Sequence, residues 1–238
     1  MTFKDTLKNS FKRIDKSTLL VLSVDAASYI LITAILAGFN ILIMEKLNSI
    51  VLPESMWQLS EQQITQLSST VQDYFHYFIA LIIITALLLI ITWAVSRALL
   101  WRISLKKKIT KKYFISSLKL GIPWFGAATA LGTALFITLK PGLSLMAASV
   151  YAVILTYYSI IIYLDFSKKG EINIIDSLKT ASTRRDLALT FILLFILYLL
   201  LTQVLRVLYF SLIGWLLSLI AYLSYFAYSR YIFIEKRG

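Results

Sequence analysis

The stretch from Arg97 to Gly121 reads RALLWRISLKKKITKKYFISSLKLG and carries eight of the 24 lysine and arginine residues in the 238-residue chain. Long apolar sequence precedes and follows it. A dense block of positive charge between two apolar runs is typical of a loop that joins two membrane spans on the inner side of a bilayer. The side of the membrane on which each other loop lies can then be assigned relative to this stretch.

The composition points to a membrane protein with several spans. The chain is 59% hydrophobic and only 15% charged, with a mean hydropathy of +0.78, whereas a soluble domain is about a quarter charged. A helix of roughly 20 apolar residues crosses the hydrocarbon core, and alternating segments of about ten residues, as in a β-barrel, are absent from the sequence. A soluble protein with six buried helices would have too few polar residues to coat it. Six uncharged runs are present: Ala26–Met44, Tyr77–Ser96, Leu120–Leu139, Pro141–Leu164, Leu187–Leu205 and Val207–Ser229.

The sequence therefore predicts an all-α bundle that forms one transmembrane domain over residues 1–238. A polar outer loop is expected at 44–73, with a short helix leading into the second span, and basic cytoplasmic segments at 101–120 and 166–186. The turn between the last two spans could lie at 202–206 or at 211–214, and Gly214 favours the second position. The expected spans are residues 19–43, 74–100, 121–139, 143–165, 187–210 and 213–231.

Amphipathic segments precede the first, third and fifth spans. Residues 1–16 alternate apolar and basic side chains at helical spacing, which predicts a helix lying in the inner interface. The apolar stretch after it is too long for a signal peptide, so we expect it in the mature protein. The three segments share a fragment, which suggests a threefold repeat of in-plane helix plus helical hairpin; chance similarity is the alternative, because Ser, Leu and Lys are common. The fragments are Asp5-Thr6-Leu7-Lys8, Ser116-Ser117-Leu118-Lys119 and Asp176-Ser177-Leu178-Lys179.

The distribution of positive charge predicts the orientation of the chain. Twenty-one lysine and arginine residues fall on the side of the opening stretch, and only Lys46, Lys140 and Arg206 fall on the other. Because loops rich in Lys and Arg stay in the cytoplasm, both termini are expected there. The net charge of +12 is thus explained by topology and does not indicate a nucleic-acid partner.

Asp25 is the most informative single residue. A carboxylate within a span costs about 2.5–3.5 kcal/mol and suggests a function or a partner. If the span begins at Leu19, Asp25 lies about 9 Å inside it. We expect an intramembrane ion pair between Asp25 and Arg97; the alternatives are an interfacial aspartate and a carboxylate that couples to an ion or substrate.

Two further groups are candidates for binding and packing. The lysines of the opening stretch are expected to contact anionic lipid, although they could serve topology alone. Small residues in the third span are expected to let helices approach closely. The lysines are Lys106, Lys107, Lys108, Lys111 and Lys112. The packing residues are Gly126, Ala130, Gly132 and Ala134.

The sequence offers no catalytic, cofactor-binding or metal-ligating set. It contains no cysteine, which excludes disulfides, thiolate catalysis and Cys-based metal sites. His76 is the only histidine and is interpreted as part of an interfacial aromatic belt. The paired aspartates, Ser–His or HExxH patterns of intramembrane proteases are absent.

Six spans with amphipathic segments before the first, third and fifth resemble the membrane domain of some glycerophosphodiester phosphodiesterases and related six-helix prokaryotic families. The resemblance covers most of the chain and rests on this architecture and on the Asp176–Lys179 fragment. It implies a multi-pass protein of a prokaryotic plasma membrane and no catalysis, because the catalytic domain is absent.

We therefore expect a non-enzymatic protein that organises lipid and protein partners or assembles with copies of itself. A transporter or channel for a small solute or lipid is the alternative, and a membrane enzyme is a third candidate without a visible catalytic set.

Overall fold

The computed structural model describes residues 3–49, 60–171 and 173–237, and these form helices and short connections without a strand. The expectation of an all-helical chain is confirmed. The middle of the predicted outer loop, residues 50–59, lies outside the described residues, as do residues 1–2 of the predicted in-plane helix. The helices are α1 (Phe3–Lys12), α2 (Lys16–Asn48), α3 (Glu61–Ser104), α4 (Lys111–Thr138), α5 (Pro141–Lys169), α6 (Ile174–Thr183), α7 (Arg185–Arg206), the 3₁₀ helix η2 (Val207–Phe210) and α8 (Leu212–Arg237).

Six of these helices are long and apolar enough to cross a bilayer, which indicates a multi-pass membrane protein. The expectation of six long apolar helices is therefore confirmed. α1 and α6 have ten residues each and are too short to cross. The six candidate spans are α2, α3 from Ser68 onwards, α4 to Leu135, α5 from Gly142, α7, and α8 from Ile213.

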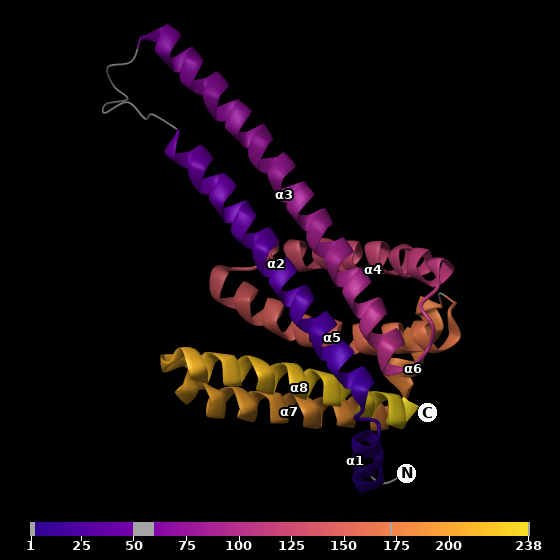
Figure 1. The fold of residues 1–238 in the computed structure, drawn as a ribbon. Coiled ribbons are helices and arrows are strands. Elements are labelled where there is room, and N and C mark those ends of the chain that lie inside the picture. Colours follow the sequence, from indigo (N-terminus) through magenta and orange to yellow (C-terminus); the bar gives the residue numbers. More distant parts are fainter. Residues whose placement is uncertain (1–2, 50–59, 172, 238) are drawn as a thin grey trace. The chain divides into compact units, whose positions relative to one another are not determined.

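The chain divides into two compact units. One unit is the hairpin of residues 28–92, which contains most of α2 and α3, running beside each other in opposite directions (Figure 1). Near its far end Ser49 and Tyr74 share a hydrogen bond of 2.7 Å, and the Lys46 ammonium lies 4.8 Å from the centre of the Tyr74 ring. Most of its large apolar side chains are exposed.

The other unit contains residues 1–27 and 93–238. Within it α4 pairs with α5, α7 pairs with α8, and α6 packs on both α5 and α7 (Figure 1). The main core gathers at one end of these helices. It includes four consecutive residues of α5 and four of α8, Ile161–Leu164 and Tyr231–Ile234. We call this region the packed end; it comprises α1 and residues 16–27, 93–121, 157–190 and 223–237.

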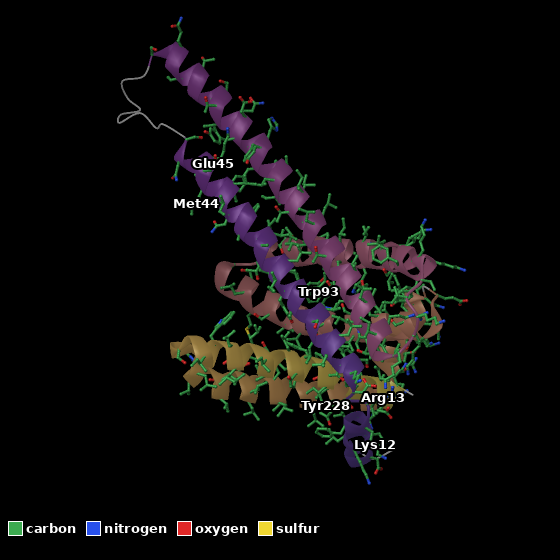
Figure 2. All side chains as sticks on the ribbon, viewed as in Figure 1. Lys12, Arg13, Met44, Glu45, Trp93 and Tyr228 are labelled. Carbon is green, nitrogen blue, oxygen red and sulfur yellow. The ribbon has the colours of Figure 1, made fainter. Side chains whose placement is uncertain are left out.

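Three short segments pack against helix ends at the packed end. α1 lies against α8 and α6 against α5, while the first turns of α4 meet the end of α3, where the Tyr113 hydroxyl donates to the Ala98 carbonyl at 2.8 Å. Figure 2 labels Tyr228 and Arg13 where α1 meets α8; the Tyr228 hydroxyl donates to the Leu7 carbonyl at 3.3 Å.

The fragment shared by the three segments has the same exposure in each. The small side chain at its second position is buried in every copy: Thr6, Ser117 and Ser177. The lysine two residues later is exposed in every copy: Lys8, Lys119 and Lys179. The similarity of sequence is therefore accompanied by a similarity of environment.

The structure differs from the expectation of a separate helix at 109–120. This segment forms the first turns of the continuous helix α4, which Thr110 caps by accepting the Tyr113 N–H at 3.2 Å. Gly121 does not end the helix; a Cβ there would lie 2.2 Å from the Ala94 Cβ, so the glycine allows α4 to approach α3 closely. The short outer helix expected before the second span is likewise continuous with α3.

The turn between the last two spans lies at residues 207–211. α7 ends at Arg206, η2 follows, and the Ser211 hydroxyl accepts the Gly214 N–H at 3.0 Å at the start of α8. Gly214 is thus inside α8 and not in the turn. It is needed for another reason: a Cβ there would lie 1.9 Å from the Leu208 carbonyl oxygen.

Candidate functional site

Asp25 is fully buried and lies between two arginines at the packed end. Arg230 Nη2 donates to Asp25 Oδ2 at 2.5 Å. Arg97 Nη1 lies 3.8 Å from the other carboxylate oxygen, Oδ1, which is too long for a hydrogen bond. Arg230 is therefore the close partner of the carboxylate, and Arg97 is a second cation beside it.

Helical spacing brings these three residues together. Val21, Leu100 and Ala227 form a small buried cluster that joins α2, α3 and α8. Each of them lies three or four positions from one of the charged residues, which places it on the same helix face. The apolar contact therefore holds the three helices in the register that the ion cluster needs.

Arg97 stacks on the face of Trp93, with its guanidinium carbon 4.0 Å from the ring centroid. Trp93 is labelled in Figure 2. The two residues are four positions apart on α3 and so share a face. Among the buried polar atoms without a hydrogen-bond partner in the described residues are Asp25 Oδ1, Arg97 Nε and Trp93 Nε1.

Sequence reasoning placed Asp25 next to Arg97 and missed Arg230. It counted Arg230 only among the 21 positive charges of the cytoplasmic side, although the residue lies in α8 with only 7% of its side chain exposed. The dipeptide Ser-Arg occurs near the end of both the second and the sixth span, at Ser96-Arg97 and Ser229-Arg230, but a shared dipeptide does not indicate which helix ends meet.

Other ion pairs connect the helices around the cluster. Arg237 of α8 binds Asp165 of α5 through two hydrogen bonds of 2.9 and 3.2 Å. Arg13, between α1 and α2, pairs with Glu235 of α8. Charges on α5 and α8 and next to α1 are thus neutralised within the protein.

The lysines of the opening stretch fall into two groups. Lys106 pairs with Asp15 at 2.5 Å, and Lys107 donates to the Lys168 carbonyl at 2.5 Å. Both lysines therefore hold neighbouring segments together. The remaining three of the five clustered lysines, which are exposed as Lys106 and Lys107 also are, lie on the loop before α4 and in its first turn: Lys108, Lys111 and Lys112.

The small residues of α4 do not all contribute to packing. A Cβ at Gly132 would lie 3.3 Å from the Tyr151 ring on α5, whereas one at Gly126 would meet no atom within 4 Å. Ala130 and Ala134 are exposed. The contact between α4 and α5 instead uses Gly132 and the buried Ala128, because the Tyr151 hydroxyl donates to the Ala128 carbonyl at 2.8 Å.

A hollow of about 410 Å³ lies between α4 and α5, within the size range of small-molecule sites. Its polar groups are two threonine hydroxyls and the Tyr151 hydroxyl, and the rest of the lining is apolar. Phe125 at one end of it makes an edge contact with Trp93, at 5.8 Å between ring centroids. The lining residues are Phe125, Ala128, Thr129, Gly132, Thr133, Tyr151, Ala152 and Leu155.

His76 is exposed on α3. Over the described ranges, no group of three or more His, Asp or Glu side chains could hold a metal ion. Comparison with known proteins shows no match to a family model, to a curated protein or to a solved structure. The features of the structure that bear on function are therefore the ion cluster, the exposed lysines and the hollow.

Proposed function

We propose that the protein lies in the plasma membrane of a prokaryote with both termini and the packed end in the cytoplasm. The basic segments support this orientation, because those at 97–119, 168–185 and 230–237 all meet at the packed end. Lys140 and Arg206 lie at the other ends of α5 and α7, as positive-inside asymmetry requires.

The fold in this proposal is a threefold repeat of a short amphipathic segment and a helical hairpin. Three observations support it: the shared fragment, its common burial pattern, and the order of packing. α1 packs on the last span and α6 on the fourth, and Tyr113 ties the start of α4 to the second span. The second and third segments thus each contact the end of the preceding hairpin, and the first segment, α1, contacts the end of the third hairpin.

The function that the geometry supports best is non-enzymatic organisation of anionic lipid and protein partners at the cytoplasmic face. The observation that carries this proposal is the exposure of Lys108, Lys111 and Lys112 beside lysines that are held by the protein. A lysine near an anionic membrane surface contributes about 1 kcal/mol of attraction. Three of them on one loop and the helix turn that follows would enrich anionic lipid locally.

The test is lipid enrichment around the purified full-length protein in nanodiscs that contain phosphatidylcholine and a minor fraction of labelled phosphatidylglycerol. Energy transfer between the protein and the labelled lipid measures the enrichment. The triple variant Lys108→Gln, Lys111→Gln, Lys112→Gln should lose most of it. The matched control, Lys140→Gln, removes an exposed lysine at the opposite end of α5 and should keep it. Equal enrichment for the triple variant and the wild type would contradict the proposal.

Transport is the second candidate, and the hollow between α4 and α5 favours it. Its largely apolar lining suits a lipid chain better than a hydrated solute. A scramblase assay with the protein in vesicles tests this candidate: faster loss of lipid asymmetry than in empty vesicles supports lipid transport, and an unchanged rate excludes it.

A further inference from the structure

The ion cluster carries an excess positive charge inside a span. Asp25 contributes one negative charge, and Arg97 and Arg230, which keep their protons in proteins, contribute two positive charges. Four other acidic side chains at or beside the packed end are paired with their own cations: Asp15, Asp165, Asp186 and Glu235. A charge within hydrocarbon is expensive unless it is paired, so the cluster calls for one further anion.

Hydrogen bonding identifies Arg97 as the place for that anion. Arg230 already donates to Asp25 at 2.5 Å, whereas Arg97 is 3.8 Å away and its buried Nε–H finds no acceptor in the described protein. The indole N–H of Trp93, one turn away, also finds none. Each buried donor without an acceptor costs about 1–3 kcal/mol, and one oxyanion could accept from both.

The Arg97 side chain is partly accessible, although its Nε and the Trp93 Nε1 are buried. The Arg97 side chain is 19% exposed, whereas that of Asp25 is fully buried. Two ring contacts connect Arg97 to the hollow between α4 and α5: its guanidinium stacks on Trp93, and Trp93 contacts Phe125, which lines the hollow. Thr129, Thr133 and Ala152 on that lining are exposed, so the hollow opens to the surface of the protein.

We propose that Arg97 and Trp93 bind the phosphate or carboxylate head of one anionic lipid whose acyl chain occupies the hollow. The positive charge and the two N–H donors match an oxyanion, and the apolar hollow within the spans matches the chain. This site deepens the proposed function, on which it rests for the lipid class, but it is distinct from the exposed lysines.

Native mass spectrometry of the full-length protein tests the site. The protein is titrated with phosphatidylglycerol and, separately, with phosphatidylcholine of the same chains. The wild type should retain one phosphatidylglycerol at least tenfold more tightly than phosphatidylcholine. Arg97→Gln should lose this preference, because it leaves the neutral pair of Asp25 and Arg230. Arg206→Gln, which removes an exposed arginine at the end of α7, is the matched control and should behave as the wild type.

Two further variants separate charge from hydrogen bonding. Arg97→Lys keeps the charge without the Nε donor, and Trp93→Phe keeps a ring without the N–H; each should weaken retention severalfold. Trp93→Phe also tests the site if Arg97→Gln fails to fold. Thr129→Trp fills the hollow and should weaken lipid retention while leaving binding of inorganic phosphate unchanged.

Competition between the bound lipid and inorganic phosphate shows whether the site accepts a free oxyanion or only a lipid head group. Displacement of the lipid by millimolar phosphate would show that a free oxyanion reaches Arg97, and resistance to it would show that the chain is required; both outcomes support the site. Equal retention by the wild type, Arg97→Gln and Trp93→Phe would overturn it. If instead the triple lysine variant loses general enrichment while Arg97→Gln loses nothing, the surface function stands and the intramembrane site does not.

Discussion

The packed end and the hairpin of residues 28–92 use the same kinds of residue in different ways. At the packed end, consecutive residues of α5 and α8 such as Ile161–Leu164 and Tyr231–Ile234 are buried, whereas most large apolar side chains of the hairpin are exposed. At the packed end the protein encloses charges, tyrosines and small polar side chains. In the hairpin, long apolar helices expose their side chains and meet through a few polar groups near the far end.

The difference shows where protein–protein packing is required in a membrane. Lipid covers apolar side chains as well as another helix does, so there is little hydrophobic drive to pack them together. Lipid tails offer no hydrogen bonds or charges to polar groups within the spans, so these groups must find partners in the protein or in a ligand. The ion pairs among the described residues are accordingly concentrated at or beside the packed end.

The largest expected effect comes from removing the buried carboxylate. Asp25→Asn leaves two arginine charges without their counter-ion and should destabilise the protein by about 3–5 kcal/mol, as breaking a buried ion pair does. Asp73→Asn removes an exposed carboxylate from the hairpin and should change stability by less than about 0.5 kcal/mol. Unfolding in mixed detergent micelles measures both.

The double variant Asp25→Asn, Arg97→Gln provides the internal check on this prediction. It leaves one positive charge in place of two, so part of the lost stability should return. A cost for Asp25→Asn no larger than that for Asp73→Asn would contradict the importance of the cluster.

The next effect concerns close helix approach. Gly121→Ala places a Cβ 2.2 Å from that of Ala94 and should cost about 1–3 kcal/mol, because the two helices must separate. Gly126→Ala lies on the same helix with no atom within 4 Å. It should be neutral or stabilise by up to about 1 kcal/mol, since alanine favours a helix over glycine. Thermal unfolding compares the two; an equal response would mean that α3 and α4 do not meet at Gly121.

A smaller effect is expected for a buried tyrosine. The Tyr157 hydroxyl donates to the Ala181 carbonyl at 2.7 Å and fixes α6 on α5. Tyr157→Phe should cost about 0.5–1.5 kcal/mol, the contribution of a typical buried hydrogen bond. Tyr74→Phe removes an exposed hydrogen bond in the hairpin and should cost less. Hydrogen exchange of the α6 amides should accelerate in Tyr157→Phe alone, and unchanged exchange there would argue against this anchoring role.

Local sequence patterns were sufficient for the spans and insufficient for the contacts between them. Apolar length predicts the six long helices, and the position of Asp25 within the first one predicts that it needs a partner. Arg230 could not be identified this way, because it lies 205 residues away and its pairing depends on which helix ends meet. The role of Gly121 could not be predicted either, because it is set by Ala94 on another helix. Residues 111–120 contain no signal that would separate them from the following span, so they form the first turns of α4.

The smallest effect concerns the exposed pair of Asp15 and Lys106. The hydrogen bond from Lys106, followed by those from Ser17, lowers the pKa of Asp15 from its ordinary value of 3.8 to about 2. Because this pKa is lower in the folded protein, the pair stabilises the fold above about pH 4 and loses that contribution as the pH falls through 2. The contribution is small, because both side chains are exposed to solvent.

Lys106→Asn tests this pair without disturbing the backbone. Lys106 has a φ of 54°, a conformation that asparagine tolerates better than most residues, so the variant removes the ammonium and retains the turn. The pKa of Asp15, followed by NMR of its carboxyl carbon, should rise towards 3.8. Lys107→Asn removes a neighbouring ammonium that binds the Lys168 carbonyl and not a carboxylate, so the pKa of Asp15 should stay near 2. A rise in both variants would mean that the general field of the lysine-rich loop lowers the pKa, and not the direct bond from Lys106.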